Sequence, residues 1–182
     1  MDGQDGRPAA DYGPFGRPIF DGPQGGVGRL DRIGVVDVGS NSVRLVVFDG
    51  AARSPAYFYN EKIMCALGTG LAETGRLNPQ GRKRALAALQ RFAALASGMG
   101  IPPLTAVATA AVREATDGAD FCAEVLAETG VVLHVIAGDE EARLSAQGVL
   151  LGWPGSYGLV CDIGGASMEL ADLAQGRVGR RV

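Results

Sequence analysis

The sequence predicts an α/β protein with a mixed β-sheet and helices on both faces of that sheet. Three strand-like runs, at 33–37, 43–48 and 56–65, follow one another with short turns between them, which favours antiparallel pairing. Helical and strand patterns then alternate along the chain, and strands joined by helical crossovers pair in parallel. A mixed sheet accommodates both kinds of connection.

The later elements give this sheet its order. A helix is expected from Asn78-Pro79, a capping residue followed by proline, to the glycines near 98–100. Strands are expected at 104–108 and 131–136 with a helix between them, and a further helix runs from Gly138 to about residue 151. The order β-β-β-α-β-α-β-α predicts a ribonuclease H-like lobe.

The chain divides into three parts. Residues 1–31 are rich in Gly and Pro and cannot bury enough apolar surface to offset their ordering entropy, so we expect a disordered leader. Residues 32–155 form the first lobe, and 156–182 begin a second, incomplete copy of two or three strands. Because no helix follows these strands to cover them, we expect the region after Gly155 to be mobile, to pack on the first lobe or to pair with another chain. We also expect the chain alone to be inactive.

Composition disfavours several classes of partner. A net charge of −3 gives no electrostatic basis for binding nucleic acid or an anionic membrane. No apolar run approaches the ~20 residues of a membrane span. The three cysteines, Cys65, Cys122 and Cys161, are far apart, which is typical of reduced thiols in a cytoplasmic protein and not of a disulfide framework or a zinc site.

The most informative stretch is the turn between the first two strands, Asp37-Val38-Gly39-Ser40-Asn41-Ser42-Val43-Arg44. Gly39 lets the backbone approach an anion closely, and Ser40, Asn41 and Ser42 add hydrogen-bond donors. Asp37, at the strand end, suits Mg²⁺ or its water shell. Alone, this motif is weak, because Gly-Ser-Asn-Ser is ordinary turn composition.

The motif occurs twice, which strengthens the interpretation. Asp162-Ile163-Gly164-Gly165-Ala166-Ser167 repeats its spacing, so that Asp37 aligns with Asp162 and Ser42 with Ser167. A repeat at this distance indicates a duplicated domain. We expect the two turns to face each other across a cleft and to hold one phosphate chain, with Mg²⁺ between them.

Other charged residues have two interpretations each. Arg113, after the strand 104–108, could pair bidentately with phosphate or be a solvated charge at a helix start. Glu140 and Glu141 complement a helix dipole, or one of them orients a water as general base. Glu169 lies where it could point toward the site that Asp162 lines. The Gly-rich stretch 67–75 is either a connection or a lid.

Four segments in this order together resemble one family. They are Asp37–Arg44, Thr109–Arg113, Ile136–Leu144 and Asp162–Glu169. They are similar to the exopolyphosphatase / guanosine pentaphosphate phosphohydrolase (Ppx/GppA) family, which belongs to the actin–Hsp70–sugar kinase superfold. The resemblance runs from about residue 32 to 182. It implies hydrolysis of terminal phosphoanhydride bonds in inorganic polyphosphate or guanosine pentaphosphate, with a divalent cation such as Mg²⁺, by a protein that forms homodimers.

The resemblance also implies roles for single residues. Glu141 lands on the family's catalytic glutamate, and Glu169 on its second important glutamate. Metal contacts are implied at Asp162 and Glu169, beside the Asp37 inferred above. Phosphate contacts carry over to the first turn, Arg113 and the second turn, that is Gly39, Ser40, Asn41, Ser42, Arg113, Gly164, Gly165, Ala166 and Ser167.

Two departures and two alternatives accompany this resemblance. Ala166 stands where the family usually has a third glycine, and family members continue for about a hundred residues beyond the last residue here. A sugar or acetate kinase of the same superfold also has two phosphate turns. A non-catalytic fragment that binds a polyanion or a partner is the other alternative.

Overall fold

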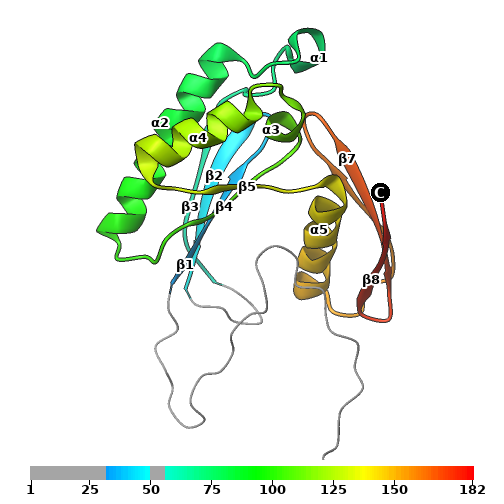
Figure 1. The fold of residues 1–182 in the computed structure, drawn as a ribbon. Helices are drawn as coiled ribbons and strands as arrows, with labels where there is room; N and C mark the ends of the chain where they lie inside the picture. Colours follow the sequence, from blue (N-terminus) through cyan, green and yellow to red (C-terminus); the bar gives the residue numbers. More distant parts are fainter. Residues whose placement is uncertain (1–31, 50–55) are drawn as a thin grey trace, which may run out of the picture.

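The computed structural model describes residues 32–49 and 56–182 and confirms the α/β class (Figure 1). A five-stranded sheet has the order β3-β2-β1-β4-β5. Its strands are β1 (Ile33–Val38), β2 (Ser42–Phe48), β3 (Tyr57–Met64), β4 (Thr105–Ala108) and β5 (Leu133–Val135). The first three pair antiparallel and the last two join in parallel, as the connections predict. The expected leader, 1–31, lies outside the described residues.

Five helices connect and cover the strands of the described part. They are α1 (Leu71–Thr74), α2 (Pro79–Gly98), α3 (Ala110–Glu114), α4 (Gly118–Thr129) and α5 (Gly138–Gly152). The start of α2 follows from its sequence, because the Asn78 side chain accepts a hydrogen bond from the Gly81 N–H at 2.8 Å and Pro79 occupies the first turn. The single-turn α1 has no counterpart among the expected elements, and the one helix expected between the strands at 104–108 and 131–136 is divided into α3 and α4.

Three helices of the described residues, α2, α3 and α4, cover one face of the first sheet. Strand residues on the inner face, among them Val36, Leu45 and Ala106, are fully buried against α2, α3 and α4. On the opposite face Asp37 and Arg44 are exposed, and no helix of the described residues packs there. The fifth helix, α5, packs on the second sheet.

The second sheet contains β6 (Gly158–Ile163), β7 (Met168–Ala174) and β8 (Arg177–Arg181), all antiparallel. Helix α5 packs on it through a small apolar cluster. The cluster is formed by Ala142, Ala146, Val149, Leu150, Val160, Ala171, Leu173 and Val178. One face of these strands is covered by the helix that precedes them, which lies within the expected first lobe, so of the three expected outcomes the structure shows packing on that lobe (Figure 1).

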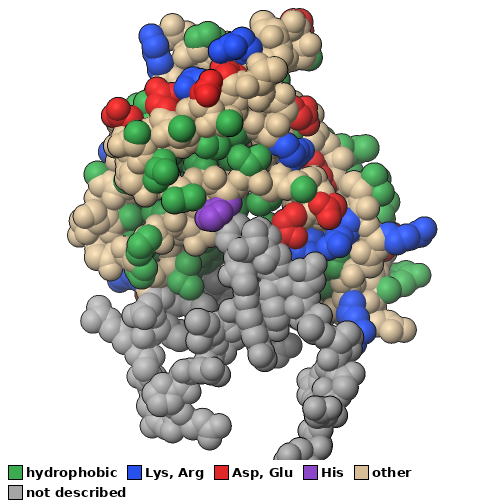
Figure 2. All heavy atoms as spheres, viewed as in Figure 1, with side chains coloured by type: hydrophobic (Ala, Val, Ile, Leu, Met, Phe, Trp, Pro, Cys, Tyr) green, Lys and Arg blue, Asp and Glu red, His purple; other side chains and the backbone are tan. Residues whose placement is uncertain are grey.

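The other face of the second sheet is exposed and apolar. Leu159, Ile163 and Met168 are each more than half exposed. Figure 2 shows apolar side chains along this edge of the molecule. Among the described helices, none is long and apolar enough to cross a bilayer. The three cysteines are free thiols, as expected.

Candidate phosphate-binding site

The two repeated turns have the same backbone structure. In the first, Asp37 pairs with Arg44 across β1 and β2, and the Gly39 N–H donates to the Ser42 carbonyl at 3.0 Å. In the second, Asp162 pairs with Glu169 across β6 and β7, and the Gly164 N–H donates to the Ser167 carbonyl at 2.9 Å. The repeat in the sequence is thus a structural repeat, residue for residue.

The two turns face each other and line one pocket of about 360 Å³. Its walls are formed by Asp37, Gly39, Ser40, Asn41, Ser42, Lys62, Thr109, Glu141, Asp162, Ile163, Gly164, Gly165 and Ser167. Of the residues expected to bind phosphate, only Ala166 and Arg113 are not in the lining. Gly165 lies directly against the first turn, because a Cβ atom at this position would come within 2.7 Å of Asn41 Nδ2.

The backbone of the first turn is held from behind. The Ser40 carbonyl accepts from the Gly68 N–H at 2.9 Å, and the Asn41 carbonyl accepts from the N–H groups of Cys65 and Ala66. Within the described chain, the N–H groups of Ser40 and Asn41 have no hydrogen-bond partner, and the same holds for Gly165 and Ala166 in the second turn. Each turn therefore retains unpaired N–H groups, which is typical of an anion-binding loop.

Arg113 contacts Glu141 in the structure. Arg113 lies on α3, directly after β4, and its Nη1 donates to the Ile136 carbonyl at 3.0 Å and to Glu141 Oε2 at 3.1 Å. Its guanidinium therefore sets the position of the Glu141 carboxylate. Arg113 does not line the pocket, so the expected direct contact with phosphate has no support in this geometry.

The two adjacent glutamates point in different directions, as their helical spacing predicts. Glu140 forms a two-pronged ion pair with Arg143 on the same helix, with distances of 2.6 and 2.7 Å. Glu141 instead faces the pocket. Figure 2 shows acidic and basic side chains next to each other over the first part of α5.

The carboxylates of the site are crowded. Burial raises the pKa of Glu141, and the charges of Glu169 and Asp162 add to this effect, whereas Arg113 opposes it. Although part of Asp37 is open to solvent, the groups packed around its carboxylate desolvate it and raise its pKa; Arg44 and Lys62 oppose this rise, and Asp162 adds to it. Negative charge is therefore concentrated where the two turns meet.

These residues fit a magnesium ion only in part. Among the described residues, no three His, Cys, Asp or Glu side chains lie so that they could hold a metal together. Asp37 and Asp162 line the pocket, but Glu169 is 4% exposed and is not in the lining. Mg²⁺ usually binds through one or two carboxylates together with phosphate oxygens and waters, so two carboxylates in the lining do not conflict with such an ion.

Three further residues of the site carry no assignment from the sequence. Lys62 enters the pocket from β3, where the register places it opposite Arg44. Thr109, at the end of β4, also lines it. The Ser145 hydroxyl, one helical turn after Glu141, donates to the Asp162 carboxylate. Of these, two had a usable signal. Thr109 follows a strand, where ligands collect in such sheets, and Ser145 lies four residues after Glu141 on the same helix face.

Comparison with known proteins agrees with this architecture. A model of the Ppx/GppA phosphatase family matches residues 46–180. "Exopolyphosphatase 1" of Mycobacterium tuberculosis is 35% identical over 143 residues, which are 77% of this chain and 42% of that protein. "Exopolyphosphatase 1" of Mycobacterium leprae is 35% identical over 144 residues, 78% of this chain and 42% of that protein.

Solved structures give the same result. A crystal structure of an exopolyphosphatase from Cytophaga hutchinsonii matches with a TM-score of 0.77 at 28% identity, covering 84% of this chain and 49% of that one. The Ppx/GppA family member of Aquifex aeolicus matches with a TM-score of 0.72 at 29% identity, covering 84% of this chain and 50% of that one. The chain spans about half the length, or slightly less, of these relatives. Since the family model matches most of its residues, the chain belongs to the Ppx/GppA phosphatase family.

Proposed function

We propose that this chain forms the phosphate-binding and water-activating part of a hydrolase that releases the terminal phosphate of inorganic polyphosphate. The observation that carries this proposal is the pocket in which two equivalent turns face each other with Glu141 between them. Curated relatives named as exopolyphosphatases support the choice of substrate class.

In this proposal the turns bind the terminal phosphate. Unpaired N–H groups of Ser40, Asn41 and Gly165, which line the pocket, donate to its oxygens. Such donors are effective because they are already oriented when charge develops in the transition state. The pocket lining carries three carboxylates against the single cation of Lys62. A polyanion therefore needs additional positive charge, which Mg²⁺ held by Asp37 and Asp162 would supply.

Glu141 is the proposed general base. Its carboxylate accepts a proton from a water that attacks the terminal phosphorus, and the bond from that phosphorus to the bridging oxygen breaks. The remaining chain leaves with the bridging oxygen and its electron pair. Arg113 positions Glu141 and favours its ionised form, because the ion pair opposes the rise in the Glu141 pKa. Arg113 is thus a positioning residue.

Phosphate release from three substrates tests the proposal. The chain is incubated with Mg²⁺ and polyphosphate, guanosine pentaphosphate or ATP. Hydrolysis of polyphosphate is the result expected of the proposed function, and it would overturn the expectation from the sequence that the chain alone is inactive. Faster hydrolysis of guanosine pentaphosphate than of polyphosphate would show that the substrate is this nucleotide and would overturn the choice of polyphosphate. Phosphoryl transfer from ATP to an acceptor would indicate a kinase, and binding without release would indicate a non-catalytic binder; either would overturn the proposal.

Variants of the helix start test the role of Glu141. Loss of a general base typically costs ~10²–10⁴ in rate, so Glu141→Gln should reduce phosphate release by this factor while polyphosphate still binds. Asp139→Asn is the matched control, since Asp139 is an exposed carboxylate in the same helical turn and outside the pocket lining. Equal losses in the two variants would refute the assignment.

A further inference from the structure

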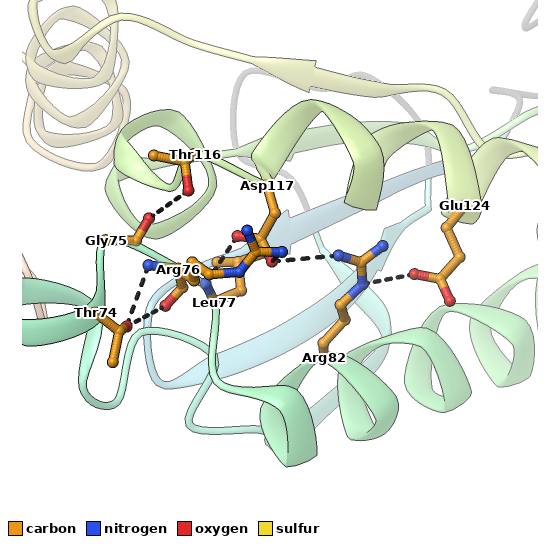
Figure 3. Close-up of polar contacts among 8 residues, drawn as sticks. All are labelled: Thr74, Gly75, Arg76, Leu77, Arg82, Thr116, Asp117 and Glu124. Carbon is orange, nitrogen blue, oxygen red and sulfur yellow. Dashed lines mark hydrogen bonds and ion pairs between the residues drawn. The ribbon is translucent and has the colours of Figure 1, made fainter.

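A buried aspartate lies away from the pocket, at the junction of α3 and α4 (Figure 3). Asp117 is 5% exposed and occupies the N-cap position of α4, but its side chain does not cap that helix. Its Oδ1 instead accepts a hydrogen bond from the Leu77 N–H at 2.9 Å. Its Oδ2 forms ion pairs with Arg82 at 3.4 Å and Arg76 at 3.5 Å. The carboxylate therefore holds a segment forty residues earlier in the chain.

Neighbouring groups strengthen the same junction. The Thr116 N–H and hydroxyl both donate to the Gly75 carbonyl, each at 2.9 Å. Arg82 is held in turn by Glu124, with Nε 2.7 Å from Oε2. Figure 3 shows these side chains converging on the stretch between α1 and α2. The loop from Cys65 to Asn78 is thus fastened to the start of α4.

The other end of this loop holds the first phosphate-binding turn. Gly68 donates to the Ser40 carbonyl, and a Cβ atom at Gly68 would lie 3.2 Å from Ser40 Cβ and 3.4 Å from Ala111 Cβ. The Asn78 N–H donates to the Leu67 carbonyl at 2.9 Å and so connects the two ends. A continuous path of contacts runs from Asp117 to the turn.

We propose that Asp117 is a positioning residue for phosphate binding. By fastening the 65–78 loop to the α3–α4 junction, it fixes the N–H groups of the first turn relative to α3, the helix that carries Arg113. The proposal rests on the proposed function, because it assumes that the turn binds phosphate. A purely structural role for Asp117 would stabilise the whole lobe without affecting the turn in particular.

Three variants separate these roles. Asp117→Ala removes both the Leu77 hydrogen bond and the two ion pairs. Asp117→Asn keeps an oxygen that can accept from Leu77 and removes only the charge. Glu124→Gln is the matched control, because it weakens the other ion pair of Arg82 and leaves the tether to Leu77 in place.

Native-state hydrogen exchange reports on the loop directly. The amides of Ala66 and Gly68 donate to the turn, so their exchange rates follow the fastening of the loop. Asp117→Ala should accelerate them by about 10- to 100-fold, the range for losing a hydrogen bond to a charged group. Asp117→Asn and Glu124→Gln should leave them close to the rates of the unaltered chain. Equal acceleration of the Val36 amide in β1 would overturn the positioning role.

Binding of tripolyphosphate with Mg²⁺, measured by calorimetry, reports on function. Asp117→Ala should weaken it by about tenfold or more, corresponding to roughly 1.4 kcal/mol, and Asp117→Asn should bind as the unaltered chain does. Unchanged affinity in Asp117→Ala would overturn the inference and leave the proposed function standing. Failure of the unaltered chain to bind would instead overturn the proposed function.

Discussion

Gly165 sets how closely the two phosphate-binding turns approach each other. A Cβ atom at this position would lie 2.7 Å from Asn41 Nδ2, 3.1 Å from Asn41 Cγ and 3.3 Å from Ser40 Cβ. Ordinary van der Waals contact of a Cβ atom begins at 3.4 Å. In Gly165→Ala the turns must therefore separate by about 0.7 Å, the difference between 3.4 Å and the 2.7 Å contact with Asn41 Nδ2, or the Asn41 amide must rotate away.

Either response should reduce function. A misplacement of about 1 Å can cost ~10²-fold in rate, so we expect Gly165→Ala to lower phosphate release by about 10- to 100-fold. Overpacking of this kind also costs about 1–3 kcal/mol of stability. The assay measures phosphate release from polyphosphate, tripolyphosphate affinity and the free energy of unfolding in urea, so that a loss of function can be separated from a loss of folded protein.

The neighbouring glycine provides the control. A Cβ atom at Gly164 would lie 3.5 Å from the Ser167 carbonyl oxygen and 3.6 Å from its hydroxyl, which is ordinary contact. Gly164→Ala should therefore stay within about twofold of the unaltered chain. Asn41→Ala in the Gly165→Ala background removes the closest contact and should restore part of the stability. Equal losses in the two glycine variants, or no restoration, would refute the reasoning.

Three other predictions follow from the ion pair, the crowded carboxylates and the second cluster. Arg113→Met removes the cation that lies 3.1 Å from Glu141, so the Glu141 pKa should rise further. The acid limb of the pH–rate profile should therefore move to higher pH. An acid limb at the same pH would contradict the proposed effect of Arg113 on Glu141. Burial raises the pKa of Asp37 above 3.8, so the folded state retains a proton that the unfolded state releases, and stability falls as pH rises through that window. Asp37→Asn should therefore raise the urea midpoint of unfolding at pH 7 and leave this midpoint unchanged below pH 3.8. An equal rise of the midpoint at both pH values would contradict the raised pKa of Asp37. Leu173→Ala should lower the free energy of unfolding by about 2–5 kcal/mol and accelerate amide hydrogen exchange in β7 more than in β1. Equal acceleration of amide exchange in the two strands would argue against a separate cluster.

The repeat of the turn could be predicted because its chemistry is local. An aspartate at a strand end, a glycine two residues later and a serine three residues after that define a turn that folds in the same way in both places. The first strands and α2 were predictable for a similar reason, since alternation and the Asn78 cap depend on near neighbours. Strand register, by contrast, brings Lys62 to the pocket, and it depends on how whole strands pair.

The packing of α5 could not be predicted from the sequence. Its apolar residues, such as Ala142 and Ala146, mark a buried face but not the sheet that covers it. Chain order places α5 next to β5, which suggested the first lobe. The structure places it on β7 and β8, where Leu173 completes the cluster. Small alanine side chains allow this close packing of the helix on the strands.

This packing explains how one helix joins the two halves of the site. Through its cluster, α5 packs against the second sheet, and its Ser145 donates to Asp162 in that sheet. Its first turn, however, carries Glu141, which Arg113 of the first lobe holds at 3.1 Å. The proposed base is therefore fixed to both halves of the chain, to the second sheet by the packing of α5 and to α3 of the first lobe by an ion pair. A change that loosens α5 from the second sheet should consequently impair phosphate release even when every residue of the pocket is intact, because Glu141 and Asp162 would no longer keep their distance from the first turn.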